Sequence, residues 1–231
     1  MTRSLAWYAN VLYVSVMLGC SSKEADGDTT AASGTRASTG ATAPDTLTAR
    51  IDAARIQGSP TAPVWVVEIS DFQCPFCKTW HDSVYRALRR EFVTPGVIRL
   101  AYINYPLPNH PNALPAAEAA MCAGAQNKFW EMHDGLFEAQ HAWGPLPNAA
   151  AVFDSVARVK GIDAAAMRRC IDSGATRALI RADAERAQES GVQGTPTFIV
   201  GGDVMMRGMQ PIEAFREAIG KKLAAREGAT R

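Results

Sequence analysis

Apolar residues in the first half of the chain form two short continuous runs, separated by a segment with helical spacing. The run PVWVVEIS at 63–70 is rich in β-branched residues and predicts a buried strand, and VIRLAYINY at 97–105 predicts a second strand. Between them, an amphipathic helix ending near 94–96 is predicted by large apolar side chains that recur every fourth residue: Phe76, Trp80, Val84, Leu88 and Phe92.

The second half of the chain has a helical block followed by strands. Residues 115–190 are alanine-rich with helical periodicity, which predicts several helices and no strand. The stretch GTPTFIVGGDVMMRG at 194–208 predicts two strands joined by a Gly-Gly turn, and Pro211 is placed to open a last helix. The predicted fold class is therefore α/β, without internal repeats.

The N-terminal segment has the pattern of an export signal. After Arg3, residues 5–19 (LAWYANVLYVSVMLG) carry no charge, and their strongly apolar part is about a dozen residues, shorter than a membrane-spanning helix. The segment ends in VMLGCSS, which resembles the lipobox of bacterial lipoproteins, although Met17 stands where leucine is usual. We therefore expect a lipoprotein signal peptide at 1–19 and a lipid on Cys20; the alternatives are an uncleaved signal anchor and ordinary cleavage nearby.

Each of these alternatives places the rest of the chain outside the cytoplasm, on the periplasmic or cell-surface side of a bacterial membrane, where disulfides persist. Residues 21–49 are mainly Ser, Thr, Ala, Gly and Asp, with Leu47 as their one large apolar side chain. Such a segment cannot offset its ordering entropy, so we expect a disordered tether over 20–49 and a folded domain over 50–231.

Charge argues against one class of partner. The 24 Lys and Arg residues nearly balance the 23 Asp and Glu residues, whereas a protein that binds nucleic acid through phosphates needs a basic excess. We therefore expect no nucleic-acid partner.

The motif CPFC at 74–77 lies where the first predicted strand meets the helix. Pro75 fits the first helical position, which puts the Cys74 sulfur at the positive end of the helix dipole and favours its thiolate. Cys77 lies almost one turn further in and should be more buried. We predict that Cys74 is the nucleophile and Cys77 the resolving thiol of a redox-active pair that needs no cofactor.

A metal site is the alternative for the same pair, with His81 as a third ligand one turn further along the helix. A closed zinc site needs four ligands, and the sequence has no second cluster to complete it, so we expect no metal. A disulfide in so short a loop would also contribute little as a structural link.

Three segments in order, VVEISDFQCPFC, AAEAAMCAGAQNKFWEMHDGLF and GVQGTPTFIVGG, resemble the DsbA-like branch of the thioredoxin superfamily. The resemblance spans about 60–225 and implies a thioredoxin fold with a helical domain inserted at about 110–190. It also implies that Pro196 is a cis-proline opposite the sulfurs. An extended substrate would then pair with the backbone of Thr195, beside Pro75 and Phe76.

The same resemblance implies a role for Glu68, since members of the superfamily often have a buried acid six residues before the first cysteine. A desolvated carboxyl there could relay a proton to or from Cys77; the alternative is an acid at the strand end that points to solvent.

His110 either borders the groove or starts a helix, while His133 and His141 show no cluster in the sequence. The alternative for Pro196 is a trans-proline at a strand start.

Phe76 departs from the best-known oxidases of the branch, which carry histidine at that position. A phenyl ring cannot stabilise the thiolate by charge, so the pKa of Cys74 should be lowered less and the disulfide should be less oxidising. We expect net disulfide formation in exported proteins, with a membrane redox partner and attachment through the lipid. A reductase of specific partners is the alternative, and a non-enzymatic surface lipoprotein that binds metal or a partner is the alternative from another class.

Cys122 and Cys170 remain once Cys20 is assigned to a lipid and the CPFC motif to redox chemistry. A disulfide between them would close a loop of about fifty residues and contribute on the order of 4 kcal/mol in the chain-entropy model. The alternative is two buried reduced thiols that pack as small apolar side chains.

Overall fold

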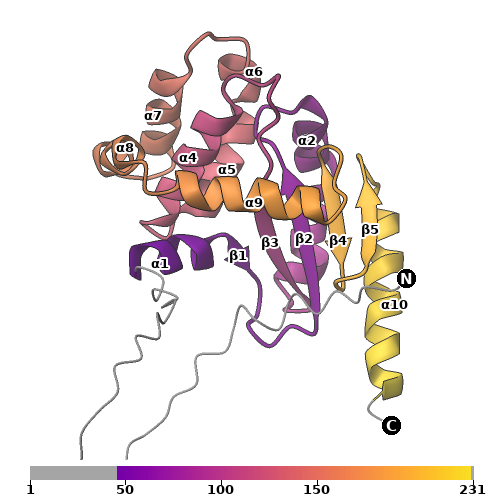
Figure 1. Cartoon of the computed structure of the whole chain (residues 1–231). Helices are drawn as coiled ribbons and strands as arrows, with labels where there is room; N and C mark the ends of the chain where they lie inside the picture. The colour runs from indigo at the N-terminus through magenta and orange to yellow at the C-terminus, as the bar shows by residue number, and fades with distance from the viewer. Residues whose placement is uncertain (1–45, 230–231) are drawn as a thin grey trace, which may run out of the picture. The chain divides into compact units, whose positions relative to one another are not determined.

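The computed structural model describes residues 46–229, which form a mixed sheet of five strands covered by helices (Figure 1). The strand order is β1-β3-β2-β4-β5. The strands are β1 (Ile56–Gln57), β2 (Val64–Ser70), β3 (Ile98–Asn104), β4 (Thr197–Val200) and β5 (Val204–Arg207). The helical segments are α1 (Thr46–Ala54), α2 (Pro75–Trp80), η1 (His81–Tyr85), α3 (Arg86–Leu88), η2 (Arg89–Val93), α4 (Ala113–Gly124), α5 (Phe129–Glu138), α6 (Gln140–Trp143), α7 (Ala150–Val159), α8 (Ala164–Ser173), α9 (Arg177–Glu189) and α10 (Ile212–Ala229).

Strands β2 and β3 are the parallel centre of the sheet, and β4 pairs with β2 in the antiparallel direction. The predicted hairpin is present: β4 and β5 pair across a turn in which Gly201 and Gly202 have φ of 63° and 91°, a conformation that glycine adopts without steric cost. The two-residue strand β1 was not predicted, because so short a segment has no detectable periodicity. The regular elements between β3 and β4 are all helices, as expected for an inserted helical domain.

The chain from α2 to η2 is one continuous helix, and its second and last segments, η1 and η2, are π-helical. Most of the predicted apolar face packs on the sheet: Trp80 is fully buried, with its ring centroid 4.5 Å from that of Phe198 in β4 and 5.8 Å from that of Phe215 in α10. Phe76 is the exception, since 63% of it is exposed. It lies in the first turn, ahead of the part of the helix that packs on the sheet.

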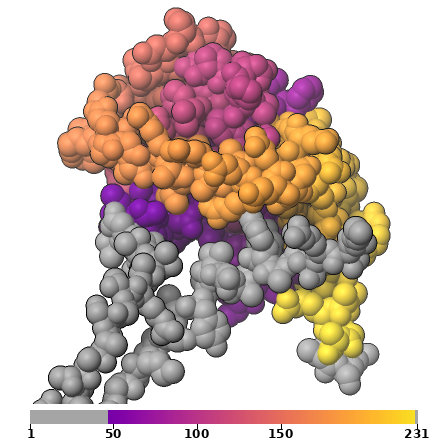
Figure 2. Space-filling model, in the orientation of Figure 1, coloured from indigo at the N-terminus to yellow at the C-terminus, as the bar shows by residue number. Residues whose placement is uncertain are grey.

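The opposite face of the sheet is covered by α9, which packs along β3. In Figure 2 the side chains of α9, in orange, form a continuous layer next to the earlier helices of the insertion, in magenta. Ile180 of α9 is buried in the same apolar cluster as Phe72, Cys74 and Cys77. The insertion therefore shares its core with the cysteine motif.

The folded domain begins earlier than predicted. Helix α1 starts at Thr46, Leu47 packs against the core and Ile51 is fully buried, so the tether expected over 20–49 is wrong for its last four positions, 46–49. Leu47 and Ile51 lie one helical turn apart and form an apolar face. This face was missed because Leu47 was considered only as the one large apolar residue of 21–49, without Ile51. The predicted signal peptide, Cys20 and the rest of the tether lie outside the described residues. None of the helices within 46–229 is both long and apolar enough to cross a bilayer.

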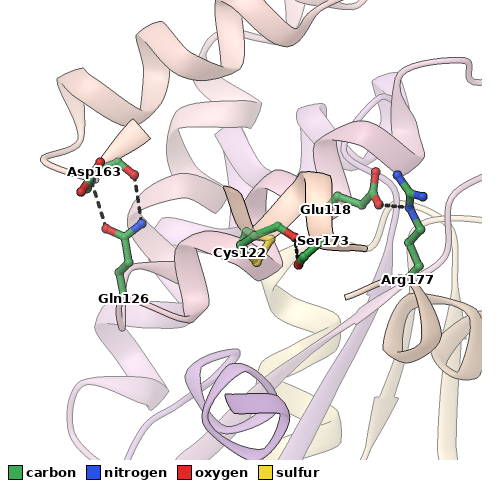
Figure 3. Close-up of a disulfide and its surroundings, with 7 residues drawn as sticks. Glu118, Cys122, Gln126, Asp163, Ser173 and Arg177 are labelled. Atoms are coloured by element: carbon green, nitrogen blue, oxygen red, sulfur yellow. Dashed lines mark hydrogen bonds and ion pairs between the residues drawn. A yellow bond between two sulfur atoms is a disulfide. The ribbon is translucent and has the colours of Figure 1, made fainter. Parts of the chain in front are cut away.

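Cys122 in α4 and Cys170 in α8 form a disulfide, as expected (Figure 3). The same figure shows two further links within the insertion. Glu118 accepts a hydrogen bond of 2.5 Å from Arg177. The side-chain amide of Gln126 donates a hydrogen bond to the carbonyl of Asp163 and accepts one from its backbone N–H (Figure 3).

Candidate active site

The cysteine motif lies at the carboxyl end of β2, where the chain turns into α2. Cys74 caps the helix with an extended backbone (φ −66°, ψ 123°), and Pro75 occupies the first turn, as predicted. The backbone amide of Cys74 donates a hydrogen bond of 3.1 Å to the carbonyl of Asp71. Both thiols are reduced; Cys74 is 3% exposed and Cys77 is fully buried.

The two sulfurs have opposite electrostatic environments. A hydrogen bond from the Cys77 thiol lowers the pKa of Cys74 to about 6 against the effect of burial, with help from the Thr195 side chain and the amides of Phe76 and Cys77. At pH 7 a thiol with that pKa is about 90% ionised, compared with about 3% for an ordinary cysteine. Burial raises the pKa of Cys77 well above its usual value, and the neighbouring Cys74 raises it further. Cys74 is therefore poised as thiolate and Cys77 as neutral thiol.

The loop before β4 lies against the Cys74 sulfur. The Thr195–Pro196 peptide bond is cis, so the trans alternative is wrong, and the Cys74 thiol lies 3.5 Å from the carbonyl oxygen of Thr195. Pro196 is buried and its carbonyl accepts a hydrogen bond of 2.8 Å from the amide of Gly208. Phe76 is exposed in the first turn of the helix that Cys74 caps.

Glu68 is fully buried, so the alternative that it points to solvent is wrong. Burial raises the pKa of its carboxyl to about 8, and a weaker opposing contribution comes from the Ser70 hydroxyl. The acid therefore keeps its proton at neutral pH. Two buried neighbours, Ser70 and Tyr102, were not predicted from the sequence, although the period of two along a strand places Ser70 on the same face as Glu68.

A buried carboxylate holds the loop that leads into the motif. Asp71 accepts hydrogen bonds from the amide of Gln73 at 2.7 Å, the amide of Leu107 at 2.9 Å and Nδ1 of His110 at 2.7 Å. His110 thus supports the loop before Cys74 from the segment after β3. Asp71 was not predicted from the sequence, because its only signal there is its place between the strand and the motif.

The helical insertion holds the same loop from the other side. The buried side-chain amide of Gln140 donates to the carbonyls of Phe72 and Cys74, at 2.7 and 3.0 Å. The side-chain amide of Gln73 donates a hydrogen bond of 2.9 Å to the carbonyl of Gly144. No local pattern in the sequence pointed to Gln140, because its role depends on contacts across more than sixty residues.

His81 is not brought to the cysteines, which removes the third ligand of the alternative metal site. Its ring nitrogens lie 3.2 Å from Asp82 and 3.4 Å from Asp134. Within residues 46–229, the group that could hold a metal ion by spacing is His81, His133 and Asp134, whose ligand atoms lie within 4.8 Å of one another. The expectation that His133 has no cluster is therefore wrong.

These three residues are already paired. Asp134 accepts from Nδ1 of His133 at 2.8 Å, and the cationic side chain of Arg89 lies 3.5 Å from its other carboxylate oxygen. Although burial opposes it, hydrogen bonds from His133 and His81 lower the pKa of Asp134. Burial lowers the pKa of His133 to about 4, so this ring is neutral near pH 7. A nearby guanidinium disfavours a bound cation, and the group is best described as a hydrogen-bond network between η1 and α5.

Together, the fold and the site define a class: a thiol-exchanging protein of thioredoxin type, with a CxxC motif at a helix start opposite a cis-proline. Comparison with known proteins shows which family within this class the chain belongs to. Residues 51–221 match the family model described as Thioredoxin, and the chain belongs to this family.

Among its relatives is a probable disulfide bond formation protein D of Bacillus anthracis, 30% identical over 169 residues, or 72% of this chain and 76% of the relative. The crystal structure of oxidised BdbD from Bacillus subtilis covers 74% of this chain and 92% of its own, with a TM-score of 0.67 and 23% identity. Chlamydia trachomatis DsbA covers 72% and 90%, with a TM-score of 0.64 and 18% identity. These two structures support the fold. Together with the family match and the Bacillus anthracis relative, they identify the chain as a DsbA-like thiol:disulfide oxidoreductase.

Proposed function

We propose that this oxidoreductase works outside the cytoplasm, attached to a membrane through a lipid on Cys20, and forms disulfides in exported proteins. The export-type N-terminal segment supports the location. The name of the Bacillus anthracis relative, a disulfide bond formation protein, supports the direction of the reaction. A membrane redox partner would restore the oxidised state after each turnover.

The observation that carries the proposal is the asymmetry between the two thiols. A substrate thiolate attacks the Cys74 sulfur of the Cys74–Cys77 disulfide, and Cys77 leaves with the electron pair. A second substrate thiolate then attacks the substrate sulfur of the mixed disulfide, and Cys74 leaves as thiolate. A thiol with a lowered pKa leaves faster, so the pKa of about 6 for Cys74 favours this second step.

Substrate would dock along the edge formed by Thr195 and Pro196 on one side and Pro75 and Phe76 on the other. The Thr195 carbonyl is already within 3.5 Å of the reacting sulfur, so an extended segment paired with it would bring its own sulfur close to Cys74. The exposed Phe76 ring offers apolar contact to the substrate in place of charge. In this proposal Glu68 supplies the proton that Cys77 needs when it leaves.

The alternative function is the reverse reaction, the reduction of specific partner disulfides. The pKa of Cys74 lies between those of thioredoxin, about 7, and DsbA, about 3.5. A neutral Phe76 contributes no charge that would move it further towards the second value. Disulfide formation is favoured because the shift from the ordinary cysteine pKa stabilises the reduced enzyme.

Two measurements test the proposal. The first is the reduction potential of the Cys74–Cys77 pair against glutathione buffers, with Cys122 and Cys170 followed separately by mass spectrometry. The second is the rate at which the oxidised protein forms disulfides in reduced, unfolded ribonuclease, with Cys74→Ser as the inactive control. A potential at or below that of thioredoxin, with no oxidation of ribonuclease, would favour the reductase. Absence of any reversible exchange would contradict both directions.

A further inference from the structure

A group of buried polar atoms near Cys77 has no hydrogen-bond partners. Among the described residues, the two carboxyl oxygens of Glu68, the hydroxyl of Ser70 and the hydroxyl of Tyr102 are all in this condition. Glu68 and Ser70 lie two residues apart on the same face of β2, and Tyr102 of β3 is the register partner of Glu68. Because an unpaired buried polar group is costly, such a concentration next to a reacting thiol calls for a functional explanation.

Ser70 is the member that the other groups share. Its hydroxyl is close enough to lower the pKa of Glu68, of Cys77 and of Tyr102. A serine hydroxyl is both donor and acceptor, and it can rotate between partners. No hydrogen bond joins Glu68 directly to Cys77, and rotation of the Ser70 hydroxyl would let it bridge the two groups.

Cys77 needs such a bridge because solvent does not reach it. Its side chain is fully buried, and Ser70 is 1% exposed. When the disulfide opens, Cys77 leaves as a thiolate in an environment that strongly disfavours charge, so a proton must reach it through the interior. Glu68 still holds a proton at neutral pH and is the buried acid of this group.

We propose that Ser70 is the proton shuttle between Glu68 and Cys77. In the forward step the substrate thiolate bonds to the Cys74 sulfur, the Cys74–Cys77 bond breaks, and Cys77 keeps the electron pair. Ser70 gives its proton to the Cys77 thiolate and takes the proton of Glu68. The products are a neutral thiol, an unchanged hydroxyl and a carboxylate, and the reverse step returns the proton by the same route.

This inference rests on the proposed roles of Cys74 and Cys77, and its test separates the two. Oxidised protein is mixed with dithiothreitol over pH 6 to 9, and the rate of opening of the active-site disulfide is corrected for the thiolate fraction of the reagent. Ser70→Thr and Ser70→Val form a matched pair of nearly equal size, in which only threonine keeps the hydroxyl. The redox equilibrium of each variant with dithiothreitol reports the thiol pair independently of the rate.

We expect the corrected wild-type rate to fall as pH rises through about 8, where Glu68 loses its proton. Ser70→Thr should keep this profile. Ser70→Val should lower the rate at pH 7 by about 100-fold, within the range of a positioned proton-transfer group, and lose the inflection. Glu68→Gln should have the same effect, and the Ser70→Val/Glu68→Gln double variant should be no slower than either single variant.

Tyr102→Phe is the second control, because it removes the other hydroxyl near the acid without touching Ser70. We expect it to change the rate by less than about threefold. A threonine variant as slow as the valine variant would show that packing, and not the proton, is responsible, and would overturn the proposal. A valine variant with the wild-type rate and inflection would also overturn it, while normal redox equilibria in the same samples would leave the proposed function intact.

Discussion

Replacing Glu68 by glutamine should change the pH dependence of stability in a defined way. The carboxyl is fully buried without a hydrogen-bond partner among the described residues, and burial raises its pKa from 4.5 to about 8. Below pH 4.5 the acid is neutral in the folded and unfolded states alike, and its contribution to stability is fully present. Between pH 4.5 and 8 only the unfolded state releases the proton, so the folded protein loses stability as pH rises.

The magnitude follows from the pKa difference. Each pH unit in this window costs about 1.4 kcal/mol, so the free energy of unfolding is lowered by about 3 kcal/mol at pH 7 and by about 5 kcal/mol above pH 8. Glutamine does not titrate and escapes this loss. Its buried amide is also unpaired, which adds an offset that does not depend on pH, so the informative quantity is the slope of the difference between the two proteins.

The assay is urea unfolding followed by circular dichroism at pH 5, 6, 7 and 8. The active-site thiols are kept reduced and the Cys122–Cys170 bridge intact, as checked by mass spectrometry. The Cys74 thiolate contributes equally to both proteins and cancels in the difference. Glu185→Gln, at an exposed position of α9, is the matched control and should stay within about 0.5 kcal/mol of wild type at every pH. Parallel stability curves for Glu68→Gln and wild type would refute the assignment of Glu68 as a buried neutral acid.

Three further predictions concern the cysteines and their neighbour. Replacing both Cys122 and Cys170 by alanine should lower the free energy of unfolding by about 4 kcal/mol, since the bridge closes a loop with a sequence separation of 48; denaturant unfolding measures this, and an unchanged midpoint would contradict it. Phe76→His should lower the pKa of Cys74 and make the disulfide more oxidising in glutathione buffers, whereas Phe76→Leu should change neither. Cys77→Ala should raise the pKa of Cys74 above about 6, because it removes the largest stabilising hydrogen bond; thiolate absorbance against pH reports the shift.

The parts of the fold that local sequence patterns encode were predictable. The runs at 63–70 and 97–105 correspond to β2 and β3, and the Gly-Gly turn to the β4–β5 hairpin. Each is a period or a turn that its own residues determine. The boundary at α1 was missed because Leu47 and Ile51 form their apolar face across the end of a polar, low-complexity segment.

The parts of the site that depend on contacts between distant segments were not predictable. Asp71 is hydrogen-bonded to His110, 39 residues further along the chain, and Gln140 is hydrogen-bonded to the carbonyl of Cys74, 66 residues before it. His133 looked isolated because its partner ring, His81, lies on a different helix. Such pairs appear only after the register of the sheet and the docking of the insertion are fixed, whereas the CPFC motif carries its chemistry within four residues.

The electrostatics of the site set both the sign and the size of its redox bias. Lowering the pKa of Cys74 from 9.0 to about 6 stabilises the reduced protein at pH 7 by about 1.4 kcal/mol, which for a two-electron couple corresponds to about 30 mV. The sign favours disulfide donation, yet the size is small beside the roughly 150 mV between thioredoxin and DsbA. The Cys77 thiol is neutral at pH 7 both at the ordinary cysteine pKa and at its raised pKa. The raised pKa of Cys77 therefore does not change the stability of the reduced protein at this pH. The potential should therefore lie nearer to that of thioredoxin, and net disulfide formation then depends on a partner that reoxidises the pair as fast as substrates reduce it.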